Sequence, residues 1–163
     1  MIDRRGFRGE AQIYIEAPPE KVYELISDVT RVGEWSPECR RCEWLDGATG
    51  PGVGVRFRGH NGHKWIRWGV TAKITEAEPG KVFAFATQPF VPINKSRQTL
   101  WRYELEATDS GTTLKESFHA LWVIPIVVLL TFGGKKARQA QLDRNLETSL
   151  ARIKAAAEAP KPP

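Results

Sequence analysis

The fold of this chain is decided by residues 17–38, which read APPEKVYELISDVTRVGEWSPE. Pro19 suits the first position of a helix, and Glu20 favours its first turn. The apolar residues that follow recur at helical spacing: Val22, Leu25, Ile26 and Val29. Trp35 and Pro37 then break this period. We therefore expect a short amphipathic helix, followed by a large aromatic side chain beside the start of a strand.

Stretches of alternating polarity predict seven strands around this helix. The first is expected near 9–15, and a second short helical turn near 30–34 follows the first helix. The other strands are expected near 38–46, 52–60, 63–76, 81–88, 97–108 and 112–122. Turn residues separate them, including Asn61-Gly62, Pro79-Gly80, Pro89 to Pro92 and Asp109-Ser110-Gly111.

The chain is expected to end in one long helix, near 135–157. Its apolar residues recur every three or four positions: Leu142, Leu146, Leu150, Ile153 and Ala157. One strand, two short helices, six strands and a long helix make an α+β plan. We expect a seven-stranded curved antiparallel sheet wrapped around the final helix, with a hollow between helix and sheet.

The short helix followed by Trp35-Ser36-Pro37-Glu38, with strands after it and a long helix at the far end, resembles a known family. This is the START-related helix-grip (SRPBCC) superfamily, in its polyketide cyclase/dehydrase and lipid-transport branch. The resemblance covers roughly residues 9–157. It implies the helix-grip fold and a hydrophobic ligand in the hollow. Members of the family either carry such ligands or act on them. We expect binding and carriage here, and the alternatives are a polyketide cyclase or dehydratase and an accessory protein that binds a membrane or a partner.

Composition and charge indicate one soluble domain of 163 residues, with 41% hydrophobic and 26% charged residues. We expect an N-terminal extension at 1–8, a ligand-binding domain at 9–158 and a disordered tail at 159–163. The N-terminus lacks the apolar stretch of a signal peptide, so a cytoplasmic location is the default. The net charge is +5, but the arginines are scattered, which argues against a nucleic-acid partner.

Asn61-Gly62 is the strongest hairpin signal in the chain, and it predicts that His60 pairs with His63 and Phe57 with Ile66. In that register one face is apolar and carries Val53, Val55, Phe57, Ile66, Trp68 and Val70. The opposite face carries Arg56, Arg58, His60, His63, Arg67 and Lys73, together with Trp65.

The next hairpin is predicted to place one carboxylate on an otherwise mostly apolar inner face. That face carries Trp101, Tyr103, Leu105, Leu114, Glu116 and Phe118. A carboxylate there must be paired, hydrogen-bonded or protonated. Glu116 is therefore a polar anchor for a ligand, an acid with a raised pKa, or the acceptor of a structural hydrogen bond from Trp35 or the backbone beside Ser36. We favour the structural bond. The Tyr103 hydroxyl meets either a ligand or water at the cavity mouth.

The residues expected to bind a ligand line the predicted hollow: Trp35, Trp68, Trp101, Tyr103, Glu116, Phe118, Leu142 and Leu146. Core packing alone is the alternative explanation for the aromatic residues. The expected ligand is a hydrophobic small molecule such as a lipid, a polyketide or an isoprenoid. No cofactor is expected, and no catalytic residue is assigned, because Glu116 is the only acid expected inside and has no inner base beside it.

Two other motifs suggest metal or redox chemistry. Cys39 and Cys42 form a C-x-x-C pattern, but residues three apart on a strand point to opposite faces, so neither a disulfide nor a shared metal is expected. His60 and His63 are expected on one face, where both imidazoles could reach one metal ion. A third ligand is missing, because His119 is expected on a different strand and no Asp or Glu is expected beside the turn. We interpret the pair as surface histidines.

The most apolar window of the chain runs from Leu121 to Phe132 and is too short to cross a membrane. Pro125 is expected to stop the last strand within it. The window either packs over the end of the sheet or forms an exposed gate at the cavity mouth. In the second case, transient membrane contact is expected through Val127, Leu129, Leu130, Lys135 and Lys136.

Overall fold

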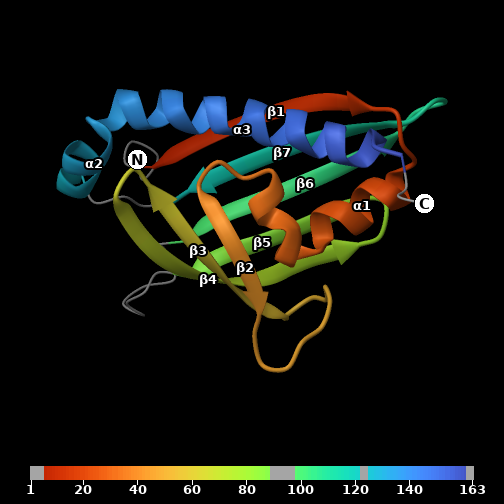
Figure 1. Cartoon of the computed structure of the whole chain (residues 1–163), viewed down its shortest axis with the longest axis horizontal. Coiled ribbons are helices and arrows are strands. Elements are labelled where there is room, and N and C mark those ends of the chain that lie inside the picture. Colours follow the sequence, from red (N-terminus) through yellow and green to blue (C-terminus); the bar gives the residue numbers. More distant parts are fainter. Residues whose placement is uncertain (1–5, 89–97, 122–124, 161–163) are drawn as a thin grey trace.

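A seven-stranded antiparallel sheet forms the body of the protein in the computed structural model (Figure 1). The structure describes residues 6–88, 98–121 and 125–160. The expected turn at Pro89 to Pro92, and most of the expected terminal segments 1–8 and 159–163, lie outside these residues. The strands are β1 (Phe7–Ile15), β2 (Cys39–Trp44), β3 (Arg56–His63), β4 (Ile66–Glu78), β5 (Val82–Gln88), β6 (Thr99–Ala107) and β7 (Thr112–Ala120). Their order in the sheet is β1-β7-β6-β5-β4-β3-β2.

The long helix α3 (Lys135–Glu158) lies across one face of this sheet, alongside β1 (Figure 1). The shorter helices are α1 (Pro19–Ser27), the 3-10 helix η2 (Val29–Glu34) and α2 (Pro125–Phe132). The sheet of seven strands around a long C-terminal helix, with two short helices after the first strand, confirms the predicted α+β helix-grip fold.

The predicted helix near residue 20 is confirmed, with Pro19 at its first position. Its inward side chains are buried: Val22, Tyr23, Leu25 and Ile26. The Asp28 side chain accepts a hydrogen bond from the Thr30 backbone N–H at 3.1 Å and so begins η2. Trp35 follows η2 and is 1% exposed, in the main core cluster.

The inward stripe of α3 is shared between two hydrophobic clusters. Leu150, Ile153 and Ala157 pack into the larger cluster, which also contains Ile15 and Leu114. Leu142 and Leu146 belong to a second cluster with Phe7, Phe118, Ala120 and Val128. The two halves of α3 are therefore held by different contacts.

The predicted register of the β3–β4 hairpin is wrong. Phe57 pairs with Ala72 rather than with Ile66, a shift of six residues, and the turn lies at Lys64 and Trp65. Asn61 and Gly62 continue as strand because β2 pairs with this part of β3 and extends the sheet. The neighbouring strand has thus overridden the local turn signal.

The shift is even, so most side chains keep the predicted face. Phe57, Ile66, Trp68 and Val70 face inward as expected. His63 does not, because it shares its face with Ile66, its cross-strand partner. Val53 also differs: it lies before β3 and is exposed.

Pro125 does not stop a strand. Strand β7 ends at Ala120, and Pro125 is instead the first residue of α2, a position that proline favours. The expected gate or cover at 121–132 is therefore helical in its second part, whereas residues 122–124 lie outside the described residues.

The substitution Lys64→Gly tests the corrected register. Lys64 has a φ of 50°, in the left-handed region where glycine carries no penalty. We expect the substitution to raise the unfolding free energy by up to about 1 kcal/mol in urea denaturation. If the turn lay at Asn61-Gly62, residue 64 would be inside a strand, and glycine would destabilise the protein by about 0.5–1 kcal/mol.

Candidate functional site

Two adjoining cavities lie between α3 and the sheet. The inner cavity has a volume of about 120 Å³ and the outer one about 440 Å³. They share the lining residues Glu38, Asn61, Val70, Thr87, Trp101 and Leu142. Together they form one hollow with a narrow end and a wide end.

The structure distributes the predicted site residues over both cavities. Trp35, Tyr103, Glu116 and Leu146 line the inner cavity, and Trp68 and Phe118 line the outer one. Trp101 and Leu142 line both. All eight residues thus surround the hollow, in two chambers rather than one, and their role in binding a ligand stays a prediction.

Glu116 lies at the inner end and is bonded to a residue on the neighbouring strand. The Tyr103 hydroxyl donates to Glu116 Oε1 at 2.8 Å, between cross-strand partners of β6 and β7. A hydrogen bond from the Trp35 side chain reaches Tyr103 in turn. The expected structural partner Trp35 therefore acts through Tyr103 and not on Glu116 itself.

Burial changes the ionisation of this pair. Glu116 is only 3% exposed. Burial raises the pKa of its carboxyl group to about 8, although the hydrogen bond from Tyr103 lowers that pKa. Burial, and then the nearby Glu116 charge, raise the pKa of Tyr103 well above its ordinary value. At neutral pH Glu116 is thus a neutral acid. Because Oε1 accepts from Tyr103, its proton belongs on Oε2.

Two buried acceptors on the cavity wall have no hydrogen-bond partner among the described residues, Glu116 Oε2 and Asn61 Oδ1. Buried polar atoms are normally paired, and an unpaired one costs about 1–3 kcal/mol. A protonated Oε2 offers a hydrogen to an oxygen atom inside the cavity. Asn61 offers an acceptor where the two chambers meet.

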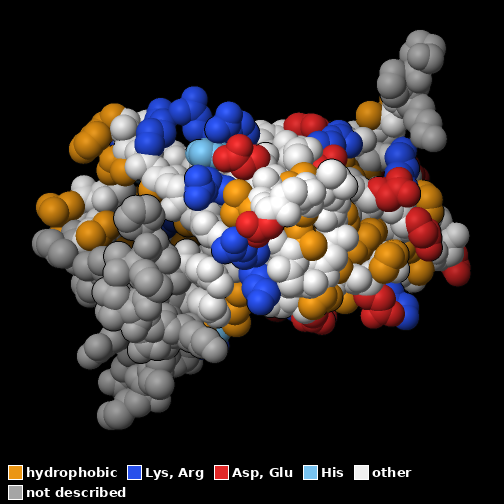
Figure 2. All heavy atoms as spheres, turned by 90° about the horizontal axis from the view of Figure 1, so that it is seen from below, with side chains coloured by type: hydrophobic (Ala, Val, Ile, Leu, Met, Phe, Trp, Pro, Cys, Tyr) orange, Lys and Arg blue, Asp and Glu red, His pale blue; other side chains and the backbone are white. Residues whose placement is uncertain are grey.

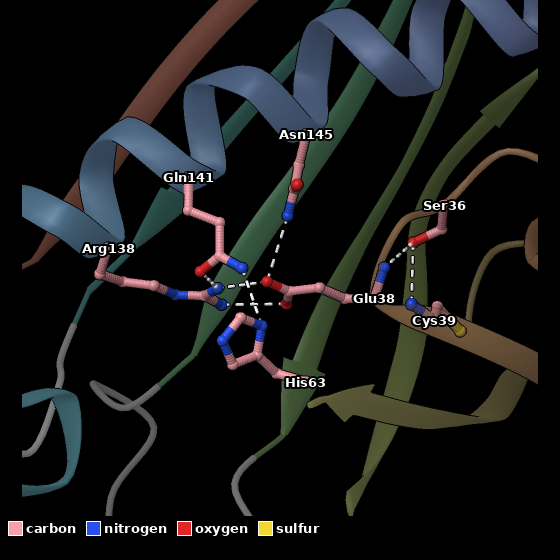
Figure 3. A network of polar contacts seen from close by, with 7 residues as sticks. All are labelled: Ser36, Glu38, Cys39, His63, Arg138, Gln141 and Asn145. Atoms are coloured by element: carbon pink, nitrogen blue, oxygen red, sulfur yellow. Dashed lines mark hydrogen bonds and ion pairs between the residues drawn. The ribbon is translucent and has the colours of Figure 1, made fainter. Parts of the chain in front are cut away.

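A polar network joins α3 to the strands where the chambers meet (Figure 3). Arg138 and Glu38 form a bidentate ion pair, with Arg138 Nη2 3.0 Å from Glu38 Oε2, and their side chains are only 12% and 17% exposed. Asn145 Nδ2 donates to Glu38 Oε1 at 3.1 Å. Glu38 therefore links the start of β2 to two positions on α3 that are about two helical turns apart.

The same network fixes the state of His63. Arg138 Nη1 donates to Gln141 Oε1 at 3.0 Å, so the amide nitrogen of Gln141 faces His63 Nδ1 at 2.8 Å. That amide nitrogen can only donate, so Nδ1 carries no proton here. The Arg138 guanidinium also lies 4.0 Å from the centre of the Phe132 ring, which ties α2 to the network.

Sequence reasoning missed this network. Glu38 stands inside the quoted Trp35–Glu38 motif, but its partner Arg138 is one hundred residues away. Glu116 was expected to be the only inner acid, but Glu38 is a second carboxylate on the described cavity wall.

The geometry expected for the cysteine pair is wrong. A β-bulge between Cys39 and Arg41 brings the Sγ atoms of Cys39 and Cys42 to 3.2 Å, both on the inner-cavity wall. The hydrogen bond from Cys42 lowers the pKa of Cys39, while that bond and burial raise the pKa of Cys42. The strand-periodicity argument failed because the bulge shifts the register by one residue.

The two histidines do not share a face. His60 Nε2 lies 2.9 Å from Glu43 Oε1 on the outer face, contrary to the expectation that no acid stands near it. His63 lies on the opposite face, against α3. Within the described residues, no three His, Cys, Asp or Glu side chains gather as a metal site would require.

A family model described as polyketide cyclase / dehydrase and lipid transport matches residues 7–158. No curated protein matches the chain. The Polyketide_cyc-like protein Cgl2372 from Corynebacterium glutamicum is 31% identical, with a TM-score of 0.54, over 95% of this chain and 91% of its own.

Other solved structures share the fold at lower identity. The Zhui aromatase/cyclase from a Streptomyces species is 19% identical with a TM-score of 0.72, and 94% of each chain is covered. Protein CV1439 from Chromobacterium violaceum is 14% identical with a TM-score of 0.69, over 94% of this chain and 98% of its own.

The protonation of Glu116 predicts how stability depends on pH. A carboxyl group with a raised pKa in the folded state stabilises the protein fully below its unfolded pKa, and this contribution is lost as pH rises through about 8. Between about pH 5 and about pH 8, this group lowers the unfolding free energy by up to about 1.4 kcal/mol per pH unit. We expect urea denaturation at several pH values to show this fall in the wild type. In Glu116→Gln the fall should shrink, and an equal fall in both proteins would contradict the prediction.

Proposed function

This chain belongs to the polyketide cyclase/dehydrase and lipid transport family, and we propose that it binds a hydrophobic small molecule between α3 and the sheet. The observation that carries the proposal is the pair of adjoining cavities between α3 and the sheet, with a neutral acid on the wall of the inner one. We assign the binding unit to residues 9–158.

The lining of the hollow supports an apolar ligand. Trp101 lies on the boundary, with its ring centre 6.4 Å from that of Phe85 in a stacked arrangement and 5.2 Å from that of Phe118. Trp68 and Phe132 meet edge to face at the wide end. Flat aromatic walls of this kind suit a lipid chain, an isoprenoid or a polyketide.

The two chambers differ in size, and this supports a ligand with a slender end. The outer chamber, at about 440 Å³, lies in the range of small-molecule sites, whereas about 120 Å³ in the inner chamber admits only a small group. Glu116 would donate to a carbonyl or hydroxyl oxygen on that slender end. The bulk of the ligand would fill the outer chamber.

Trp101→Ala tests the proposal with the matched control Trp65→Ala. Trp101 borders both chambers, whereas Trp65 is 83% exposed in the β3–β4 turn. With the neutral fluorophore N-phenyl-1-naphthylamine as probe, we expect Trp101→Ala to weaken binding by about 1–3 kcal/mol and Trp65→Ala to leave it unchanged. Circular dichroism checks folding, and Trp101→Phe provides a milder variant.

Native mass spectrometry of the purified protein shows whether it carries a bound small molecule. A co-purified molecule that is extracted by organic solvent supports the proposal and identifies the ligand. If the probe does not bind to the well-folded wild type and no molecule co-purifies, the ligand-binding proposal is overturned.

A second candidate function is cyclisation or dehydration of a polyketide in the same hollow. The protonated Glu116 favours it, because an aldol cyclisation forms a carbon–carbon bond and leaves an alkoxide that needs a proton. We place it second because a base is also needed. The other carboxylate on the described cavity wall, Glu38, is held in its ion pair with Arg138.

Glu116→Gln separates the two functions while keeping the shape of the side chain. We expect any conversion of a poly-β-ketone thioester by the wild type to change by less than about tenfold, because we assign Glu116 to ligand polarity. A general acid would lose about 10²–10⁴-fold in rate. A loss of that size in a well-folded variant, measured by chromatography of the products, would favour the cyclase.

A further inference from the structure

The outer face of α2 is an exposed apolar surface. Val127, Leu129 and Leu130 are 48%, 55% and 78% exposed. Figure 2 shows hydrophobic side chains gathered at the left end of the molecule, where α2 lies in Figure 1, with Lys and Arg side chains beside them. Adjacent exposed aliphatic side chains on one helix mark an interaction surface rather than ordinary solvated surface.

The inner face of the same helix is a wall of the outer chamber. Val127, Val128, Thr131 and Phe132 line that chamber. Val128 is buried with Phe7 and Phe118 and anchors the helix to the sheet. On this side of the outer chamber, the eight-residue helix α2 lies between the proposed ligand and the surroundings.

The charged residues nearest to α2 in the sequence are all basic. Residues 117–142 contain no Asp or Glu, and their three Lys and Arg residues are Lys135, Lys136 and Arg138. Lys135 and Lys136 are exposed at the start of α3, directly after α2. Arg138 is instead engaged by Glu38. The surface therefore combines exposed aliphatic side chains with two exposed cations.

We propose that α2 and the first turn of α3 dock on an anionic lipid bilayer. The aliphatic side chains would enter the headgroup and acyl boundary, and the lysines would contact anionic headgroups. A protein partner is less well matched, because the exposed side chains lack the aromatic and arginine anchors that dominate protein interfaces. No helix in the described part of the chain is long and apolar enough to cross a membrane, so α2 would lie in the interface.

This docking would bring the wide end of the hollow to the lipid. Gly133 and Gly134 join α2 to α3 with φ values of 79° and 105°, conformations that glycine adopts without strain. They mark the position at which α2 would pivot on docking, with the contacts of Val128 released and α3 still packed. A hydrophobic molecule would then pass between bilayer and hollow without crossing water. The docking goes beyond the proposed ligand binding and does not depend on it.

Flotation with vesicles tests the docking on the full chain. We use vesicles of phosphatidylcholine with and without phosphatidylglycerol and compare the wild type with L129S/L130S and K135E/K136E. Val127 is left unchanged because it also lines the outer chamber. We expect the wild type to float with the anionic vesicles and to be released by salt, and each double variant to lose about tenfold or more in partitioning.

Matched controls alter the same residue types elsewhere. V53S/L100S changes two exposed aliphatic side chains outside α2, and K64E/K73E reverses two exposed charges in the β3–β4 turn and on β4. Both should float like the wild type. N-phenyl-1-naphthylamine binding in solution, measured on every variant, separates loss of docking from loss of ligand binding or of folding.

Several outcomes would overturn the docking. Wild type left in the unbound fraction with both kinds of vesicle would do so, as would equal flotation of the wild type and both α2–α3 variants. Size-exclusion chromatography tests whether a second copy of the chain binds α2 instead. A wild-type dimer that becomes a monomer in L129S/L130S would show this and would overturn membrane docking.

Discussion

The structure depends on how a straight helix meets a curved sheet. Helix α3 contacts the sheet along β1 and β7, where Leu150 and Ile153 pack into the main core. A sheet that curls around this helix leaves its middle strands at a distance, and the two hydrophobic clusters do not fill the space between. The hollow is thus a direct result of the geometry. Where the two chambers meet, the ion pair between Arg138 and Glu38 joins α3 to the start of β2.

The two carboxyl groups on the described wall of this hollow are stabilised in different ways. Glu116 is neutral because burial outweighs the hydrogen bond from Tyr103. Glu38 accepts two hydrogen bonds from the Arg138 guanidinium. A neutral acid at the narrow end and a compensated charge at the junction allow an apolar molecule to enter without meeting an unpaired ion.

Local signals predicted the elements well and their partners less well. Pro19 and the apolar spacing after it placed α1, and the six predicted inner residues of β6 and β7 face inward because alternation survives in a sheet covered on one side. The turn predicted at Asn61-Gly62 does not form, because pairing with β2 keeps these two residues in strand β3. The predicted geometry of the cysteine pair was wrong because the alternation of side chains along a strand does not reveal a β-bulge. The contacts of Glu38 and His63 with α3 could not be predicted, because they join residues far apart in sequence.

The two-residue period of the β3–β4 hairpin limits how the length of its strands can change. A hairpin that gains or loses residues in pairs on each strand keeps its apolar face toward the core, whereas an odd change turns that face to solvent. This hairpin also carries Ile66 and Trp68 on the rim of the outer chamber. Paired insertions or deletions in this hairpin would therefore reshape the wall of the outer chamber and leave the strands around Glu116 in place.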